Sequence, residues 1–286
     1  MGADSLGFDE KIGGQGGSAW VSTGSRWACP GFEVVEYPGA RVLARREVVP
    51  WVRSVLASGQ GLHAASAGDR AALRVEGRDP VFIIPAKLSK GAGSGDRWAV
   101  RHYTRGGRFL PALLGDRYAR SGRVRPYHEV AASEAARERG IPTPKVMAAA
   151  MYPAGFFYRA DLVTAFVPNA SDLVDALFDT RRKGAGGAAD RLDSLWAAGE
   201  LLRHMAEAGL RHRDIHARNI LLEWQGGTPR PHLLDLDRCD VRPEGVLLSP
   251  TSMHLRLRRS LRKWEHRTGI HISGKEWETL DQAVAG

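Results

Sequence analysis

A short polar segment between apolar runs constrains this chain more than any other feature. Residues 212–219 read His-Arg-Asp-Ile-His-Ala-Arg-Asn, and residues 233–237 read Leu-Leu-Asp-Leu-Asp. The first run places Asp214 and Asn219 five residues apart, and the second adds Asp235. Transfer of a phosphoryl group from ATP uses a carboxylate near the attacking hydroxyl, together with an amide oxygen and a second carboxylate as Mg²⁺ ligands. The spacing therefore predicts a phosphoryl-transfer site.

Each of these polar residues has an expected role. Asp214 is expected to accept or orient the proton of the attacking hydroxyl. Asn219 and Asp235 are expected to bind Mg²⁺, which prefers oxygen ligands and usually takes only one or two carboxylates. Asp and Asn also cap turns, and this alternative stays open for Asp214 and Asn219. His216 is a candidate for contact with a phosphate or with the acceptor hydroxyl, the alternative being a structural hydrogen bond.

Composition narrows the class of protein. A length of 286 residues accommodates one large domain or two lobes. The two cysteines are far apart and form no CxxC motif, which argues against a disulfide framework and fits a cytoplasmic protein. No apolar run approaches the roughly 20 residues of a membrane span. The net charge of +9 favours anionic partners. No nucleic-acid-binding motif is present, so nucleic acid is not an expected partner.

The first half of the chain has mostly strand-like patterns joined by short turns. Such a succession favours an antiparallel sheet. Residues 1–30 are rich in Gly and Ser and are expected to be disordered or loosely ordered. A long helix is expected from Arg125 to Arg139, because Gly140 and two prolines follow. The expected strands are 32–43 (a hairpin), 71–76, 81–84, 97–103, 156–158 and 162–167, with a short helix at 47–56.

The second half favours helices. Residues 190–208 show the clearest helical period, and Gly209 ends it. Two apolar runs around Gly226-Gly227 predict a two-stranded ribbon that presents Asp235. This order predicts an α+β, bilobal protein-kinase-like fold, with an antiparallel-sheet N-lobe carrying one long helix and a short, mainly helical C-lobe. We expect residues 31–168 to form the N-lobe and 169–286 the C-lobe, with ATP near Val167-Pro168.

The first half also offers phosphate ligands. The run Trp98-Ala99-Val100-Arg101 resembles the strand that carries the phosphate-binding Lys of protein kinases. Here the basic residue is Arg101, whose planar guanidinium group can bind two phosphate oxygens at once. Its expected partner is Glu129, with Glu134 as the alternative. Lys87 and Lys90 are rival phosphate ligands. Gly77, in the place of the Gly-rich loop, is expected to bring backbone amides close to a phosphate.

These residues together resemble the lipopolysaccharide kinase group, which includes kinases of 3-deoxy-D-manno-octulosonic acid (Kdo) and of core heptoses. The resemblance covers roughly Gly77 to Arg242. Its most specific parts are Val100-Arg101-His102-Tyr103-Thr104-Arg105-Gly106-Gly107, Leu114-Gly115-Asp116-Arg117-Tyr118, Gly140-Ile141-Pro142-Thr143-Pro144, Phe157-Tyr158-Arg159-Ala160-Asp161-Leu162 and Leu234-Asp235-Leu236-Asp237-Arg238.

The resemblance implies ATP-dependent phosphorylation of a Kdo hydroxyl on a lipid A precursor or related glycolipid. It implies ATP and Mg²⁺ as cofactors, and His216 and Arg105 as residues that meet the acceptor. The expected place of action is the cytoplasmic face of the inner membrane. One departure is Asp79, where the family tends to have a second glycine in the phosphate loop.

Other acceptors remain as alternatives. They are a heptose or another small molecule, a protein substrate, and a pseudokinase that only binds nucleotide. The short chain after Asp235 shows no activation segment, and His216 replaces the Lys usual in protein Ser/Thr kinases, so a protein substrate is less favoured. Residues 253–267 form a basic amphipathic pattern that either lies on an anionic membrane or packs its apolar side into the core.

Overall fold

Antiparallel strands and long helices divide between two units of this chain. The structure is a computed structural model, and it describes residues 29–75, 80–88, 96–104, 115–120, 124–178 and 188–286. One unit comprises Met1–Ala131 and Lys145–Phe166, and the other comprises Ala132–Pro144 and Val167–Gly286. Most of the segment predicted to be disordered, residues 1–30, lies outside the described residues.

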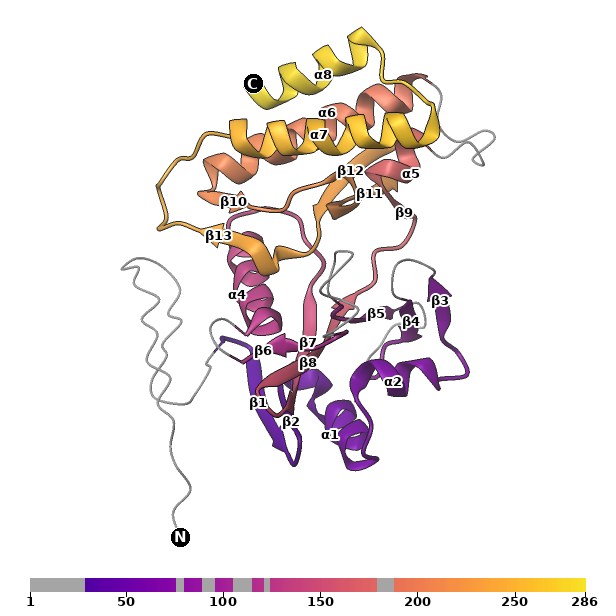
Figure 1. Ribbon diagram of the computed structural model, residues 1–286, viewed down its shortest axis with the longest axis vertical. Coiled ribbons are helices and arrows are strands. Elements are labelled where there is room, and N and C mark those ends of the chain that lie inside the picture. Colours follow the sequence, from indigo (N-terminus) through magenta and orange to yellow (C-terminus); the bar gives the residue numbers. More distant parts are fainter. Residues whose placement is uncertain (1–28, 76–79, 89–95, 105–114, 121–123, 179–187) are drawn as a thin grey trace. The chain divides into compact units, whose positions relative to one another are not determined.

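The first unit is built on an antiparallel sheet (Figure 1). Its strand order in the described residues is β1-β2-β7-β8-β5-β4-β3, and β6 pairs with β8. The strands are β1 (Phe32–Tyr37), β2 (Ala40–Arg45), β3 (Leu73–Val75), β4 (Val81–Pro85), β5 (Arg97–His102), β6 (Tyr118–Ala119), β7 (Val146–Ala154) and β8 (Phe157–Ala165). In this order β5 and β8, which are distant in the sequence, are neighbours at the centre of the sheet.

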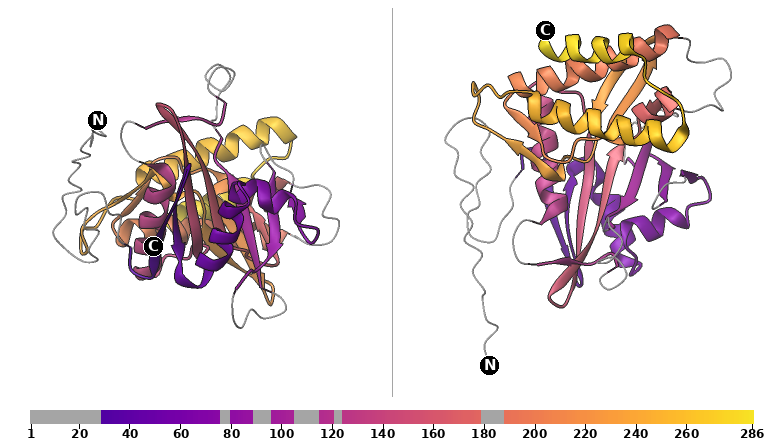
Figure 2. Two further views of the ribbon diagram at one scale, coloured as in Figure 1. Left: turned by 90° about the horizontal axis from the view of Figure 1, so that it is seen from below. Right: turned by 45° about the horizontal axis from the view of Figure 1, so that its top comes forward.

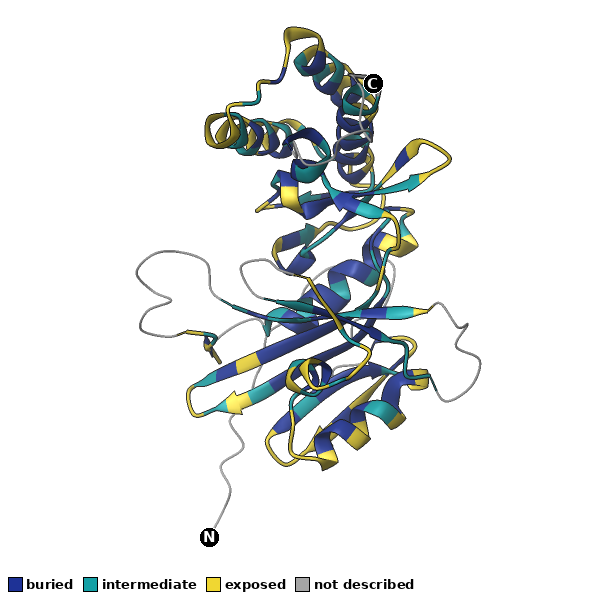
Figure 3. Cartoon of the chain, turned by 90° about the vertical axis from the view of Figure 1, so that its right-hand side faces the viewer, coloured by how far each residue is buried: buried dark blue, intermediate teal, exposed yellow. Residues whose placement is uncertain are grey.

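Helices pack on both faces of this sheet. Alternate residues of a strand point to opposite sides, so each central strand contributes side chains to both faces. The helices of this unit are η1 (Arg46–Val48), α1 (Val49–Ala57), α2 (Leu62–Ala67) and the first half of α4 (Arg125–Glu138). Val100 and Val163 share one cluster with residues of α1 and α2. Leu162 packs in another cluster with Tyr127 and Val130 of α4. The central strands are accordingly buried along most of their length (Figure 3).

The second unit is mainly helical and also holds two small sheets, β12-β11-β9 and β10-β13, in its described part. Its elements after α4 are β9 (Ala170–Asp172), α5 (Leu173–Phe178), α6 (Ala188–Glu207), β10 (Leu210–His212), η2 (Ala217–Asn219), β11 (Ile220–Gln225), β12 (Thr228–Leu233), η3 (Leu236–Arg238), β13 (Cys239–Val241), α7 (Thr251–Thr268) and α8 (Gly274–Ala285). Leu195 and Leu202 of α6 share a core with Leu261 of α7 and Leu280 of α8. These three helices are seen together in Figure 2.

Helix α8 begins with a capping box. The Ser273 hydroxyl accepts a hydrogen bond from the backbone N of Glu276, and the Glu276 carboxylate accepts one from the backbone N of Ser273. Arg191 of α6 donates to the same carboxylate at 2.5 Å. Helix α8 is not among the predicted helices, although the Ser-x-x-Glu pattern at residues 273–276 is a signal for a helix start.

Gly199 permits the close packing of α6 against α8. A Cβ atom at this position would lie 2.6 Å from the Cβ of Ala283 and 2.9 Å from the backbone O of Leu280. Gly199→Ala is therefore expected to lower the free energy of unfolding by about 1–3 kcal/mol through overpacking. Urea denaturation measures this, with Gly274→Ala as the control, because a Cβ there meets nothing within 4 Å. Equal stability of the two variants would contradict the packing.

The predicted fold class is confirmed: the chain is α+β, with an antiparallel sheet in the first unit and a mainly helical second unit. The assignment of 31–168 and 169–286 as kinase lobes stays a prediction. Both cysteines, Cys29 and Cys239, are buried. In the described parts of the chain, no helix combines the length and apolar character needed to cross a membrane.

Candidate active site

A buried histidine joins the two segments that carry the predicted catalytic residues. The backbone N of Asp214 donates to Nδ1 of His212 at 3.1 Å, so Nδ1 is an acceptor and the ring proton lies on Nε2. Nε2 then donates to the backbone O of Asp235 at 2.9 Å. Burial lowers the pKa of His212, which keeps the ring neutral and suited to both bonds. His212 is thus a structural link between the loop of Asp214 and the turn of Asp235.

Asn219 makes further links between the same segments. Its side-chain Nδ2 donates to the backbone O of Asp214 at 3.2 Å, and its backbone O accepts from the N of Leu234 at 2.9 Å. The Asp214 carboxylate itself is 53% exposed, and Nη1 of Arg238 lies 3.3 Å from its Oδ2. The structure therefore brings Asp214, Asn219 and Asp235 together and leaves the Asp214 carboxylate accessible.

Asp235 has an unusual backbone conformation. It lies in the left-handed region at φ 61° and ψ 53°, directly after the β11–β12 ribbon. For a residue with a Cβ this conformation is strained by about 1–3 kcal/mol and persists where the surroundings impose it. The preceding Leu233 is held on both sides, because its N donates to the O of Pro142 at 2.8 Å and its O accepts from Thr143 Oγ1 at 2.8 Å. Such strain is concentrated at functional sites.

The donor set around this loop fits Mg²⁺ better than a transition metal. In the described residues, no group of three or more His, Cys, Asp or Glu side chains is arranged to hold a metal ion. Mg²⁺ needs no such cluster, because phosphate and water oxygens complete its shell around one or two protein ligands. The amide nitrogen of Asn219 is engaged with Asp214, so the amide oxygen is the atom available for a cation. With the Asp235 carboxylate, it would supply the hard oxygen ligands that Mg²⁺ prefers, and this role stays a prediction.

The other polar residues of the loop have distinct environments. Nε of Arg213 donates to Oδ2 of Asp240 at 2.7 Å, and Arg211 donates to the same oxygen at 3.0 Å. Burial would raise the pKa of Asp240, but the two guanidinium groups outweigh it and lower that pKa. His216 is half-buried in extended backbone, and its O accepts from the N of Asn219 at 2.8 Å. Contact of His216 with an acceptor stays a prediction.

The first unit brings Arg101 and Glu129 together. Nη2 of Arg101 lies 2.5 Å from both carboxylate oxygens of Glu129, and the Tyr103 hydroxyl donates to Oε2. The guanidinium carbon of Arg101 also lies 4.6 Å from the centre of the Tyr103 ring. The Glu129 side chain is only 4% exposed, whereas that of Arg101 is 30% exposed. Glu129 thus holds Arg101 in place while the Arg101 side chain still reaches solvent. A phosphate-binding role for Arg101 stays a prediction.

Lys87, another predicted phosphate ligand, does not join this pair in the structure. Lys87 follows β4 beyond the Pro85–Arg97 end of the β4–β5 ladder, whereas Arg101 lies near the other end. Nζ of Lys87 is paired with Oδ2 of Asp69 at 2.8 Å. Gly77, Lys90 and Arg105 lie outside the described residues. Their predicted contacts with phosphate and acceptor remain predictions.

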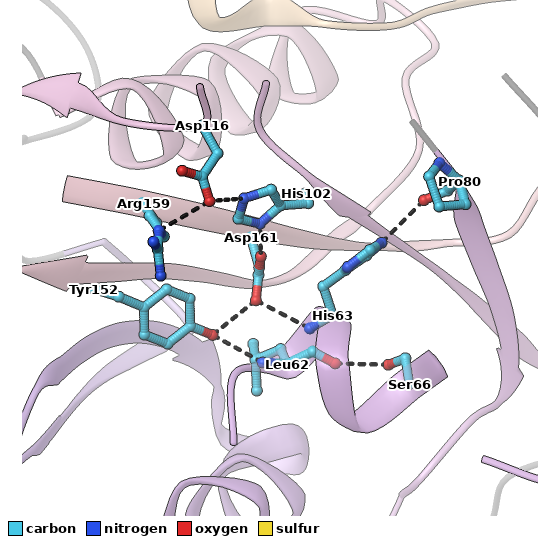
Figure 4. Close-up of polar contacts among 9 residues, drawn as sticks. All are labelled: Leu62, His63, Ser66, Pro80, His102, Asp116, Tyr152, Arg159 and Asp161. Carbon is cyan, nitrogen blue, oxygen red and sulfur yellow. Dashed lines mark hydrogen bonds and ion pairs between the residues drawn. The ribbon is translucent and has the colours of Figure 1, made fainter. Parts of the chain in front are cut away.

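The opposite face of β5 carries a buried polar cluster centred on Asp161 (Figure 4). Oδ1 of Asp161 lies 2.6 Å from Nδ1 of His102, and its Oδ2 accepts from the Tyr152 hydroxyl at 2.8 Å and from the backbone N of His63 at 2.9 Å. Nε2 of His102 reaches Oδ2 of Asp116 at 3.1 Å. Burial raises the pKa of Tyr152, so the phenol keeps the proton that it donates.

This Asp161 cluster fixes the start of α2 on the sheet. The backbone N of Leu62 donates to the Tyr152 hydroxyl at 2.8 Å, beside the bond from His63 to Asp161. A Cβ at Gly61 would lie 3.3 Å from both Tyr152 and Asp161, so this approach is tight. This cluster was not predicted, although three of its members, His102, Asp116 and Asp161, lie in the segments that resemble the family. Those residues now have a structural explanation.

The charge of His102 makes stability depend on pH. Burial would lower the pKa of His102, but hydrogen bonds and attraction from Asp161 and then Asp116 outweigh it and raise that pKa above 6.5. Its ring also faces His63 at 5.6 Å, and Arg159 lies beyond Asp116 at 2.9 Å. A raised folded-state pKa gives stability that is complete below the unfolded pKa and is lost as pH rises through the folded value.

His102→Gln is therefore expected to be most destabilising below pH 6.5, and its effect is expected to shrink as pH rises above that value. Urea denaturation of both proteins, from about pH 5 to about pH 9, measures the difference. His266→Gln is the control, because His266 is exposed on α7. A difference that grows with pH would show that His102 is not a cation in the cluster.

Comparison with known proteins assigns the chain to a family. Residues 89–283 match the lipopolysaccharide kinase (Kdo/WaaP) family. The chain belongs to the lipopolysaccharide kinase family. The predicted family and the prediction of a phosphotransferase are confirmed, and this kinase family implies ATP as the phosphoryl donor.

Individual members of the lipopolysaccharide kinase family are similar over most of their length. A protein named 3-deoxy-D-manno-octulosonic acid kinase from Photobacterium profundum is 33% identical over 187 residues, which cover 64% of this chain and 73% of that protein. One of the same name from Mannheimia succiniciproducens is 32% identical over 208 residues, covering 72% of this chain and 80% of that one.

A solved structure supports the fold. The chain described as WaaP in complex with acyl carrier protein superimposes with a TM-score of 0.50 at 14% identity, covering 86% of this chain and 88% of that one. At this identity the likeness concerns the fold alone.

Proposed function

We propose that this lipopolysaccharide kinase family member transfers the γ-phosphoryl group of Mg²⁺-bound ATP to a hydroxyl of Kdo in a lipid A precursor. The observation that carries the proposal is the hydrogen-bonded arrangement of Asp214, Asn219 and Asp235 in a chain whose relatives are named Kdo kinases. The family supports the reaction class, and the relatives support the acceptor.

Asp214 is the proposed base. Its carboxylate is more than half exposed, so an acceptor hydroxyl can approach within hydrogen-bonding distance. The hydrogen bonds of its backbone to His212 and Asn219 hold the loop, and Arg238 helps to orient the carboxylate. Asp214 would accept the hydroxyl proton as the oxygen attacks the γ-phosphorus. His216 and Arg105 are proposed to contact the acceptor sugar.

Asn219 and Asp235 are the proposed Mg²⁺ ligands. Bound Mg²⁺ would neutralise charge on the phosphate oxygens. Asn219 would contribute its amide oxygen. The left-handed backbone conformation of Asp235 sets the direction in which its side chain leaves the backbone. Arg101, oriented by Glu129, is the proposed phosphate ligand, with Lys87 and the backbone at Gly77 as further candidates. Because the proposed acceptor is a membrane glycolipid, we place the activity at the cytoplasmic face of the inner membrane.

The test is a comparison of acceptors. The protein is incubated with ATP, Mg²⁺ and either a Kdo-bearing lipid A precursor, a heptose-bearing core fragment or a Ser/Thr peptide mixture, and each product is read by mass. We expect one phosphate on the Kdo-bearing acceptor, lost when Mg²⁺ is chelated. Phosphate found only on the heptose fragment or only on the peptides would show that Kdo is not the acceptor. Nucleotide binding without any transfer would instead indicate a pseudokinase.

A further inference from the structure

Helix α7 has two chemically different sides. Met253, Leu257 and Leu261 are fully buried in the core of the second unit, and Trp264 packs against that core. The apolar side of the basic amphipathic pattern is therefore used in folding. Insertion of these residues into a bilayer would require them to leave the core, so any contact of α7 with a membrane must use its other side.

The other side is exposed and cationic. Arg256, Arg259 and Lys263 follow one another at spacings of three and four residues, which places them along one face of a helix. The α7 cationic face consists of these residues and the exposed cationic side chains beside them: Arg256, Arg259, Arg262, Lys263 and Arg267.

No acidic side chain of α7 neutralises this face. The acid of the helix, Glu265, is largely buried and accepts from the backbone N of Ile272 at 2.8 Å. Asp281 of α8 is engaged with Arg258 and His254, which lie outside the cationic face. The cationic face from Arg256 to Arg267 extends over about 16 Å, at about 1.5 Å per residue. This row of charges is longer than a single phosphate group.

Helix α7 also contacts the loop that carries Asp214. The Ser260 hydroxyl accepts a hydrogen bond from the backbone N of Ala217 at 3.1 Å. The Trp264 ring has two guanidinium groups near it, that of Arg218 at 4.7 Å and that of Arg267 at 4.3 Å. A surface bound by α7 would therefore lie next to the proposed catalytic loop within the same unit.

We propose that the α7 cationic face docks on the anionic phospholipid surface of a bilayer. The proposal rests on the proposed function, because a membrane glycolipid acceptor requires the enzyme to work at such a surface. An extended row of solvated cations matches a plane of lipid headgroup charges, and this attraction is additive per Lys or Arg near the surface. Docking is electrostatic, leaves the buried residues of α7 in the core, and holds the loop of Asp214 close to acceptors in the bilayer.

The test compares two charge-reversed proteins with the wild type. One carries R256E, R259E and K263E on the α7 cationic face. The control carries R53E, R70E and K275E, which makes the same change in net charge at exposed positions on other helices and a turn. Binding is measured by co-sedimentation with phosphatidylcholine vesicles, with and without phosphatidylglycerol, at low and high salt. Circular dichroism and thermal unfolding establish that each variant is folded.

We expect the wild type and the control to bind the anionic vesicles, to release them at high salt, and to ignore pure phosphatidylcholine. The α7 variant is expected to bind at least about 100-fold more weakly, because three cations are replaced. It should also lose kcat/KM for an acceptor embedded in vesicles while keeping that for a soluble Kdo oligosaccharide. Equal vesicle binding by the α7 variant and the wild type would overturn the proposal.

Binding that depends on α7 but selects an acidic protein or nucleic acid over vesicles would also overturn it. Vesicle binding needs no turnover, so the two proposals can fail separately. If no acceptor is phosphorylated while α7-dependent vesicle binding persists, the proposed function fails and the docking surface stands.

Discussion

Replacing Asp214 by asparagine is expected to lower kcat by about 10²- to 10⁴-fold, the usual contribution of a positioned general base. The change keeps the side-chain shape and removes the carboxylate that would accept the hydroxyl proton. The side chain is 53% exposed, and Arg238 contacts it at 3.3 Å, so little stability should be lost. Steady-state kinetics gives kcat, calorimetry gives the affinity for Mg²⁺–ATP, and urea denaturation gives stability.

The matched control is Asp193→Asn, which removes an exposed carboxylate from α6 in the same unit. We expect that variant to keep the wild-type kcat. If Asp214→Asn also keeps it, another group accepts the proton and the assignment of Asp214 as the base is wrong. If Asp214→Asn loses nucleotide affinity and stability together, the residue supports the loop and does not act as a base.

Glu129→Gln is expected to lower the free energy of unfolding by about 2–3 kcal/mol. Loss of one partner from a buried ion pair usually costs about 3–5 kcal/mol, and the value here is smaller because Arg101 remains 30% exposed. The carboxylate is 4% exposed and accepts from both Arg101 and Tyr103. The affinity for ATP is expected to fall as well, because Arg101 would no longer be held in place.

Glu138→Gln is the control for this change, since Glu138 is exposed on the same helix. A second variant, Arg101→Lys, keeps the charge and loses the planar fork, so we expect it to weaken ATP binding more than stability. Unchanged ATP affinity in both Glu129→Gln and Arg101→Lys would show that the pair is only structural. Equal stability of Glu129→Gln and Glu138→Gln would contradict the buried ion pair.

Local patterns explain why much of the fold was predictable. The β11–β12 ribbon was expected because Gly226 and Gly227 permit the positive φ angles of 58° and 88° that its turn adopts. Helix α6 was expected from its apolar period, and the structure places it at Ala188–Glu207. The position of β5 between β4 and β8 was not predictable, because the pairing of β5 with β8 joins segments about 60 residues apart and no local pattern encodes it.

The same distinction applies to the site. Asp214, Asn219 and Asp235 could be grouped because they lie within one loop and one ribbon. Bonding of His212 to backbone groups could also be expected, but the two segments that it joins could not, because they depend on which ring nitrogen meets which backbone group. The Asp161 cluster combines side chains and amides from α2, β5, β7 and β8, and such a meeting exists only in the folded sheet.

The most direct test of Kdo phosphorylation is the position of the new phosphate. A Kdo-bearing lipid A precursor is incubated with the wild-type protein, ATP and Mg²⁺, and the purified product is studied by ³¹P NMR with through-bond correlation to sugar protons. We predict one new phosphomonoester signal correlated with a proton of the Kdo ring, and none with Asp214→Asn. A new phosphate correlated with another sugar, or the same product from Asp214→Asn, would contradict the proposed reaction.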